Sequence, residues 1–349
     1  MQGDARPVAR IPAPTIGGAA LPLIAGAMAA SGLDAPAAFA AVGLPAHLAF
    51  ARDAALNSIP LSVFTALLQR AGTQLPAHPA LWRCGREIVE PALRGLFPAG
   101  ATCRSLGELI TGVLSDLQQL QAGTSMRLDV EDGLCLVSYR IIDPSIWPRS
   151  RDAEFTLGFL HGIVTRCSGS LPPGTVTLAF EHERDSGADL AGESRSEPLH
   201  GQPTNLLAFP AALLEEPVPA GLRAPALLHG GQTMKNPEGN GGTSVAGDIV
   251  EAVYARLGQG PLDQSTIAAD CGLSRRSLRR RLSLAGLSFR GVIEDARLSY
   301  ALWALRETHL PVAEIAWRLG YDDQGAFARA FRRQAGISPS GARRELPKA

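Results

Sequence analysis

Apolar residues recur at helical spacing through the first 120 residues of the chain. They repeat at intervals of three and four residues, which places them on one face of a helix. The clearest case follows Ser105, where Ser105-Leu106-Gly107-Glu108 has the form of a capping box. Helices are predicted at about residues 18–31, 35–42, 61–73, 79–89 and 105–120.

The period then changes from helical to alternating. Met126, Leu128 and Val130 alternate with polar residues, Asp132-Gly133 supplies a turn, and residues 134–142 are extended again. This pattern predicts a β-hairpin. Further elements are expected in the same region: a helix over 152–167, strands over 175–182 and 206–209, and a helical turn over 211–215. Helices followed by strands of this kind predict an α+β domain.

The stretch Ile267–Leu282 has the pattern of a helix-turn-helix. Ile267 and Ala268 form the buried side of a first short helix, and Gly272 suits a tight turn because glycine adopts positive φ readily. Ser274 is a good N-cap for the next helix. That helix carries two inward-facing leucines and five arginines: Leu278, Leu282, Arg275, Arg276, Arg279, Arg280 and Arg281. Arginines four residues apart share a face and repel each other, and a polyanion would remove that repulsion.

The same pattern occurs a second time about 50 residues later. Ile315-Ala316 and Gly320 repeat the first helix and its turn at a spacing of 48 residues. Asp323 is expected to cap the second helix of this repeated unit. The repeat continues with Phe327, Arg329 and Phe331 at a spacing of 49, and with Gly336-x-Ser338 after Gly286-x-Ser288 at a spacing of 50. An internal repeat of this length argues against a merely solvated arginine face.

One long helix is predicted between the two copies, over residues 289–308, with Ser288 as its cap. A helix of about 18 residues spans roughly 27 Å. It can therefore hold two recognition helices about one DNA turn apart on one side of a duplex. The C-terminal domain is predicted to be all-α, with two helix-turn-helix units joined by this helix.

On these residues the region 246–346 resembles the AraC/XylS family of transcription regulators. The matching stretches are Arg297-Leu298, Val312–Ala316, Gly320-Tyr321, Phe327–Arg333 and Gly336–Pro339. Two positions depart from the family pattern, because Gly325 stands where the family often has serine and Ala342 stands where it has an aromatic residue. The resemblance implies a sequence-specific DNA-binding regulator.

The resemblance also implies roles for individual residues. Arg276, Arg279 and Arg280 take the major-groove positions of the first reading helix, where arginine can bond guanine O6 and N7. Gln324 and Arg329 take comparable positions in the second. The contacts expected to position the protein on phosphates come from Arg275, Arg332 and the two N-caps, Ser274 and Asp323.

The N-terminal half resembles the ligand-binding domain of one AraC subgroup, which is related to ornithine-utilisation regulators and named for arabinose binding. The matching stretches are Gly32-Leu33-Asp34, Val42–Pro45, Ile59-Pro60-Leu61, Ser105–Glu108, Asp132-Gly133 and Asn205–Phe209. A Phe-Gly step usual before the last strand is absent, and residues 193–201 stand there instead. The resemblance implies a small-molecule effector without naming it or its ligand residues.

Charge and composition divide the chain in the same way. From Val245 onward there are 16 basic and 11 acidic residues, against 17 basic and 22 acidic residues in the remainder. This difference fits a basic DNA-binding domain attached to an acidic regulatory domain. Residues 217–247 hold seven glycines and four prolines without apolar periodicity, as a linker does. The expected parts are a tail over 1–15, a ligand-binding and dimerisation domain over 16–216, a linker over 217–245 and the DNA-binding domain over 246–346.

Candidate chemistry is weak elsewhere in the sequence. There is no nucleophile elbow, phosphate-cradling loop or dinucleotide fingerprint, and the five cysteines form no CxxC pair or zinc-like cluster. We therefore predict no catalytic residue, cofactor or metal, and reduced, mostly buried thiols. Five other residues could line a ligand pocket or have a structural role, and the structural role is favoured for each. His161, Trp82 and Trp147 are interpreted as core residues, and Arg94 and Arg140 as members of surface ion pairs. His182, between two glutamates, is expected to be solvated.

The sequence thus predicts a transcription regulator, with activation favoured by family tendency. Its expected partners are promoter DNA, a small-molecule effector, RNA polymerase and a second copy of the chain. The apolar run 16–30 is too short to span a bilayer and is broken by glycine and proline, so a cytoplasmic protein is expected. Two alternatives stay open: a constitutive DNA-binding dimer without an effector, and an alkyl-transfer repair enzyme fused to a DNA-binding module, which would need an activated cysteine.

Overall fold

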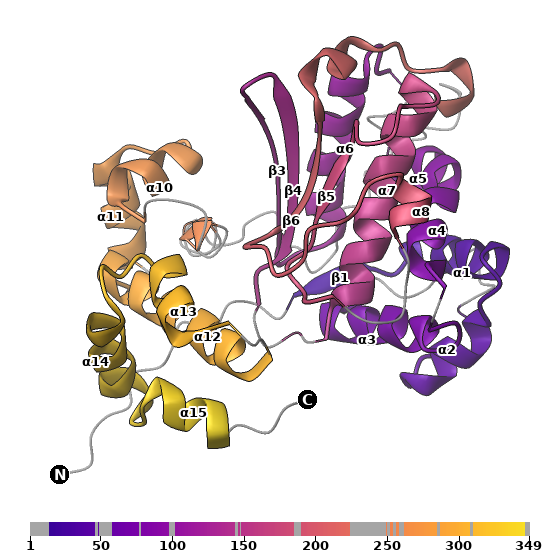
Figure 1. Ribbon diagram of the computed structural model, residues 1–349. Coiled ribbons are helices and arrows are strands. Elements are labelled where there is room, and N and C mark those ends of the chain that lie inside the picture. Colours follow the sequence, from indigo (N-terminus) through magenta and orange to yellow (C-terminus); the bar gives the residue numbers. More distant parts are fainter. Residues whose placement is uncertain are drawn as a thin grey trace. The chain divides into compact units, whose positions relative to one another are not determined.

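The structure is a computed structural model. It describes residues 14–45, 48, 58–76, 78–97, 102–143, 146, 148–184, 190–223, 249, 252–253, 256–257, 262–284, 287–307 and 310–345. The described chain divides into two units, an N-terminal one within residues 14–223 and a C-terminal one within residues 249–345 (Figure 1). Most of the expected tail, most of the expected linker and Trp147 lie outside the described residues, and Thr15, the last residue of that tail, begins a strand.

The N-terminal unit begins with helices, as the apolar periodicity predicts. Its helices are α1 (Ala20–Ala30), α2 (Ala35–Ala41), α3 (Leu61–Gly72), α4 (Ala80–Glu87), α5 (Val89–Gly95), α6 (Leu106–Leu120), α7 (Ser150–Ser168) and α8 (Ala191–Ser194). The capping box is formed, because Ser105 Oγ accepts from Glu108 N at 3.3 Å and Glu108 Oε2 accepts from Arg104 N at 2.8 Å. The helix over 79–89 is wrong in extent, since α4 ends at Glu87 and α5 follows it after Ile88.

A four-stranded antiparallel sheet follows α6 in the chain. Its strands lie in the order β3 (Thr124–Glu131), β4 (Leu134–Ile141), β6 (Asn205–Pro210) and β5 (Thr177–Ala179). The predicted hairpin is confirmed: Asp132 and Gly133 both have positive φ, 49° and 77°, as a two-residue hairpin turn requires. A second, two-stranded sheet pairs β1 (Thr15–Gly17) with β2 (Ser58–Pro60). The predicted α+β class is therefore confirmed.

One face of the larger sheet is covered by α6 and α7 (Figure 1). Cys135, Val137 and Tyr139 alternate along β4 and are all buried against these helices. After β6 the chain forms two short 3-10 turns, η3 (Ala211–Glu215) and η4 (Ala220–Leu222). Val218 N donates to Arg104 O at 3.0 Å, so the described unit continues beyond Glu216 to Arg223.

Two side chains expected at the surface are buried at the end of this sheet. Arg140 is only 4% exposed and pairs with Glu181, 3.5 Å away, which also accepts from Arg149 at 2.8 Å. His182 is 6% exposed beside the rings of Phe180 and His200. The prediction failed for both because β5 ends at Ala179, and the chain that follows turns inward to pair with residues 199–202.

Helix α7 is the central helix of the unit, and α4 packs on it at backbone contact. A Cβ placed at Gly85 of α4 would lie 2.0 Å from Phe155 O, and one placed at Gly158 of α7 would lie 2.4 Å from Trp82 O. Trp82 is fully buried, as expected of a core residue. Only glycine at these positions lets the two helices approach so closely.

The C-terminal unit is all-α, as predicted. Its helices are α10 (Gln264–Asp270), α11 (Arg275–Leu284), α12 (Phe289–Glu307), α13 (Val312–Arg318), α14 (Gln324–Ala335) and α15 (Pro339–Glu345). Within the described residues of both units, none of the helices has the length and apolar character needed to cross a membrane.

The glycine contact between α4 and α7 yields a stability prediction. Gly85→Ala is expected to lower the free energy of unfolding of the N-terminal unit by about 1–3 kcal/mol or more, because the added methyl group overlaps a backbone oxygen. The matched control is Gly26→Ala in α1, where an added Cβ meets nothing within 4 Å and the loss of a helical glycine stabilises by up to about 1 kcal/mol. Urea unfolding of each full-length variant measures both. Equal stability of the two variants would contradict the close packing.

Candidate nucleic-acid interface

The first helix-turn-helix is held by local backbone and capping contacts. Asp263 caps α10, its Oδ1 accepting from Ser265 N at 2.8 Å. Gly272 has a φ of 62°, and Leu273 N donates back to Ala268 O at 2.7 Å, which closes the turn. Ser274 Oγ accepts from Ser277 N at 3.1 Å, so the predicted N-cap of α11 is confirmed.

The second unit repeats the turn and the cap of the second helix, although its first helix, α13, follows Pro311 and has no side-chain cap. Gly320 has a φ of 73°, and Tyr321 N donates to Ala316 O at 3.0 Å. Asp323 Oδ1 accepts from Ala326 N at 2.7 Å, which confirms the predicted cap of α14. The helices that follow the two units are also capped alike, by Ser288 at 3.0 Å from Gly291 N and by Ser338 at 3.0 Å from Gly341 N.

Both units bury the residues that the repeat pairs. The set is Ile267, Ala268, Leu278 and Leu282 in the first unit and Ile315, Ala316, Phe327 and Phe331 in the second, each no more than 2% exposed. Helix α12 joins the units and buries Val292, Ala296, Tyr300 and Ala304 along one face. The predicted long helix is therefore confirmed, with 19 residues.

Leu278 and Leu282 of α11 are buried, and most of its arginines are exposed. Arg275, Arg276, Arg279 and Arg280 are exposed, and Arg281 is half-buried. Arg279 Nε donates to Gln264 Oε1 of α10 at 2.7 Å, which orients that guanidinium in the free protein. Four exposed cations within six residues make this helix a favourable surface for a polyanion.

Helix α14 presents a smaller polar face. Gln324, Arg329 and Arg332 are exposed on it, as is the capping residue Asp323. Gly325 leaves room beneath Arg329, because a Cβ there would lie 3.3 Å from the Arg329 guanidinium and 2.9 Å from Asp323 Oδ1. A serine at this position, usual in the resembling family, would crowd both side chains.

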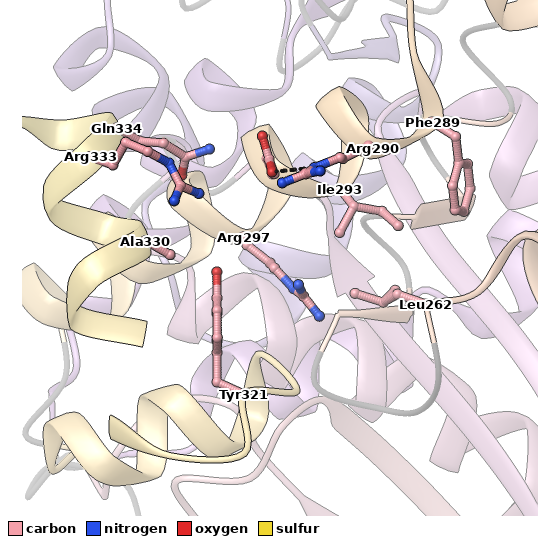
Figure 2. Close-up of a pocket in the computed structure, with 10 residues that line it drawn as sticks. Leu262, Phe289, Arg290, Ile293, Arg297, Tyr321, Ala330, Arg333 and Gln334 are labelled. Atoms are coloured by element: carbon pink, nitrogen blue, oxygen red, sulfur yellow. Dashed lines mark hydrogen bonds and ion pairs between the residues drawn. The ribbon is translucent and has the colours of Figure 1, made fainter. Parts of the chain in front are cut away.

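A cleft of about 400 Å³ lies between α12 and α14 within this unit (Figure 2). Arg290, Arg297 and Arg333 line it, together with Tyr321 and Gln334. None of these five residues is among those expected to bind DNA. The spacing of seven between Arg290 and Arg297, which puts both on one face of α12, is the only signal in the sequence that points to the cleft.

The N-terminal unit contains a small apolar cavity with a volume of about 40 Å³. Phe64, Leu117 and Phe159 are among the apolar side chains around it, and Gln121 and Thr156 are its polar residues. Gln121 Nε2 donates to Tyr139 Oη at 3.2 Å, so this hydrogen bond joins the lining of the cavity to a buried tyrosine.

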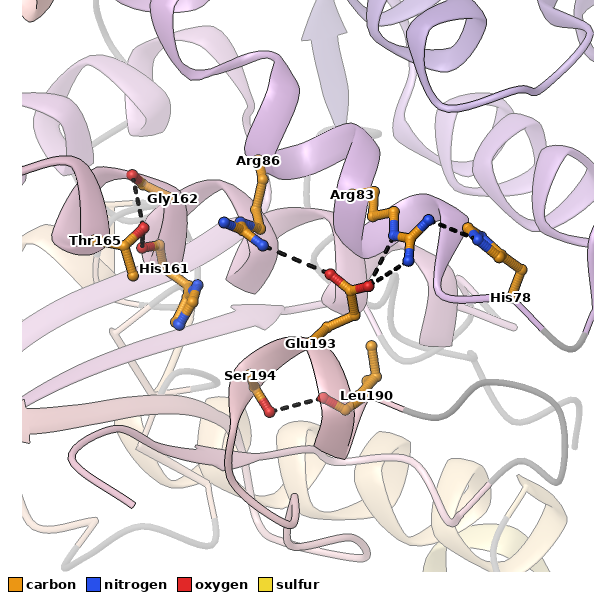
Figure 3. Close-up of polar contacts among 9 residues, drawn as sticks. All are labelled: His78, Arg83, Arg86, His161, Gly162, Thr165, Leu190, Glu193 and Ser194. Carbon is orange, nitrogen blue, oxygen red and sulfur yellow. Dashed lines mark hydrogen bonds and ion pairs between the residues drawn. The ribbon is translucent and has the colours of Figure 1, made fainter. Parts of the chain in front are cut away.

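His161 lies outside that cavity, on α7 beside α4 (Figure 3). Its ring is 5% exposed and lies 5.0 Å from the ring of Trp82, so the interpretation as a core residue is confirmed. Its Nδ1 nevertheless has no hydrogen-bond partner among the described residues. Burial and the charge of Arg86 lower the pKa of His161 to about 4. Arg86 is held by Glu193, 3.6 Å away.

The remaining candidate residues carry little chemistry. Arg94 is exposed and pairs with Glu90 at 3.3 Å, as predicted for a surface ion pair. All five cysteines are free, and burial raises the pKa of Cys135 and of Cys167 to about 11, so neither is a thiolate at neutral pH. No group of His, Cys, Asp or Glu among the residues that the structure describes could hold a metal ion.

Comparison with known proteins matches both halves of the chain. A family model described as the arabinose-binding domain of AraC transcription regulators matches residues 32–218, and a helix-turn-helix domain model matches residues 267–345. An uncharacterized HTH-type transcriptional regulator of Mycobacterium tuberculosis is 29% identical over 269 residues, which are 70% of this chain and 73% of that one. The ornithine utilization regulator of Pseudomonas aeruginosa is 43% identical over 88 residues, 25% of this chain and 26% of that one.

Among solved structures, the DNA-binding domain of the global transcriptional factor AdpA, in complex with a target DNA, is 32% identical with a TM-score of 0.25. It covers 29% of this chain and 89% of that one.

Two capped helix-turn-helix units with exposed arginine faces define a DNA-binding transcription regulator. Because the arabinose-binding model matches more than half of it, the chain belongs to the AraC family, with an arabinose-binding-type N-terminal domain. Its relatives are transcription regulators, which are not enzymes.

The buried His161 yields a prediction of pH dependence. Because its folded pKa of about 4 lies below the usual value near 6.5, the unfolded chain binds the extra proton first and stability is lost as the pH falls. The stability of the wild type relative to His161→Gln is therefore expected to fall by about 1.4 kcal/mol per pH unit between about pH 6.5 and pH 4, and to level off below that. Other titrating groups are present in both proteins and cancel. Parallel pH profiles of the two unfolding free energies would contradict the assignment.

Proposed function

We propose that this protein is an effector-controlled activator that reads promoter DNA with two helices on one side of the duplex. The observation that carries the proposal is the repeated unit at each end of α12, in which a side chain, Ser274 or Asp323, caps the reading helix. Helix α12 has 19 residues and so spans about 28 Å, close to the rise of one DNA turn. Two reading helices at that separation enter successive major grooves.

The exposed side chains of the two reading helices contact the bases. In α11 these are Arg276, Arg279 and Arg280, which offer bidentate donors to guanine. Gln324 and Arg329 take this part in α14, and Arg275 and Arg332 contact phosphate. The caps serve the interface by fixing the first turn of each reading helix, which holds backbone N–H groups toward the phosphates.

The effector of this proposal binds the N-terminal unit and is small and largely apolar. The cavity there is surrounded by aliphatic and aromatic side chains and offers only Gln121 and Thr156 for hydrogen bonds. A free sugar would leave several hydroxyl groups without partners, at a cost of about 1–3 kcal/mol each. An apolar molecule with one polar group suits the cavity, which must widen to admit more than a few atoms.

The wider setting follows from this function. A promoter-bound activator acts on RNA polymerase and works in the cytoplasm, where the chromosome is. The N-terminal unit is proposed to pair two copies of the chain. The competing function is a constitutive DNA-binding dimer, which has the same reading helices and no effector.

The role of Arg280 is tested by its effect on sequence preference. Selection of bound duplexes from a random library first defines the site, and Arg280→Ala is then expected to weaken binding by about 1–3 kcal/mol and to relax the preference at one base pair. Arg275→Ala is the control, because loss of a phosphate contact weakens all sequences alike. A uniform loss for Arg280→Ala would assign it to phosphate instead.

Effector control is tested by measuring the affinity of the full chain for the selected duplex with and without fractionated metabolite extracts. We expect one apolar fraction to change the dissociation constant by about 5-fold or more, the size of a typical allosteric coupling. Affinity that no fraction alters would favour the constitutive dimer and leave the DNA reading intact.

A further inference from the structure

The cleft between α12 and α14 carries more positive charge than its own contacts neutralise. Three guanidinium groups line it, from Arg290, Arg297 and Arg333, and the carboxylate of Glu294 is also in its lining. Arg290 Nε donates to Glu294 Oε1 at 2.9 Å, which neutralises one of the three. A net charge of about +2 is left in a concave site, where the field of the cations is concentrated.

The other two arginines are not neutralised by a carboxylate among the described residues. The Arg297 guanidinium lies 4.8 Å from the centre of the Tyr321 ring, and its Nε is buried without a hydrogen-bond partner among the described residues. Arg333 is exposed on α14 and has no ion pair or hydrogen bond within the described part of the chain. Figure 2 shows Arg297 and Tyr321 pointing into the space between the two helices, with Arg333 and Gln334 at its rim.

We propose that this cleft binds a phosphate group. Arginine forks donate paired hydrogen bonds to phosphate oxygens, and a guanidinium already stacked on an aromatic ring loses little freedom when it does so. The Gln334 amide and the Tyr321 hydroxyl add neutral donors at the same cleft. At about 400 Å³ the cleft is large enough for a phosphate ester as well as for a bare anion.

The phosphate group has two possible sources, the backbone of bound duplex DNA and a free phosphorylated molecule. In the first case the cleft adds a backbone contact from the α12 side of the unit, apart from the reading faces of α11 and α14. In the second case the C-terminal unit has a ligand site of its own. The DNA source rests on the proposed function, and the free source does not.

The test uses the full chain, with Arg333→Gln as the cleft variant and Arg344→Gln as the control. Arg344 is an exposed arginine on α15 that does not line the cleft, so both variants remove one surface charge from the same unit. Neither side chain makes a hydrogen bond or an ion pair with the part of the chain that the structure describes, and circular dichroism checks that both variants fold. Two measurements are made on each protein.

The first measurement is the melting temperature with sodium pyrophosphate or with sodium chloride at equal ionic strength. A free phosphate source predicts that pyrophosphate raises the melting temperature of the wild type and of Arg344→Gln, and that Arg333→Gln loses most of the rise. The second is the salt dependence of affinity for a mixed-sequence duplex. A DNA source predicts that the slope of log K against log salt becomes less negative by about 0.9 in Arg333→Gln alone.

Either result, or both, supports a phosphate site and names its source. The proposal is overturned when Arg333→Gln matches the wild type in both measurements, or when Arg344→Gln shows the same changes, because a general loss of charge then explains them. Failure of the wild type to bind DNA would contradict the proposed function, and the pyrophosphate measurement would still decide the cleft.

Discussion

The DNA-binding unit depends on a backbone turn that only glycine makes without strain. In each helix-turn-helix a glycine with positive φ, Gly272 or Gly320, ends the first helix. The next residue then donates back to the alanine carbonyl five residues before it, which fixes the direction in which the chain leaves. A cap follows within three residues, and the reading helix starts at a set angle to its partner. The positions of the exposed arginines of α11 and α14 follow from this turn.

The reading helix itself gains little from its own sequence. Four exposed arginines within six residues of α11 repel one another, and the hydrogen bond from Arg279 to Gln264 relieves only part of that repulsion. The helix is held by Leu278 and Leu282 against the buried pair of α10. Binding to a polyanion removes the remaining repulsion. A surface that is unfavourable alone and favourable on DNA is the physical basis of the proposed function.

The sequence predicted those features that depend on neighbouring residues. The turns at Gly272 and Gly320, the caps Ser274 and Asp323 and the hairpin at Asp132 are local, and the residue types needed for them are specific. Features that depend on distant segments were missed or wrong. Gly85 and Gly158 matter because two helices meet at their backbones, which no local pattern reveals.

Burial of charged residues shows the same limit. The salt bridge of Arg140 needs Glu181 from a segment about 40 residues away. The cleft was missed for the same reason, because Arg333 of α14 joins Arg290 and Arg297 of α12 only through the tertiary fold. Periodicity also extended the helix over 79–89 past its end at Glu87 and gave no sign of α5, the separate short helix that begins at Val89.

Two helices of one chain are proposed to bind one side of a DNA duplex. Hydroxyl-radical footprinting of the full chain on a selected duplex reports this arrangement without an intermediate assumption. We expect two protected patches about one helical turn apart, roughly 10 base pairs, on the same face of the DNA. A single patch, or two patches on opposite faces, would contradict the arrangement of two equivalent reading heads joined by α12.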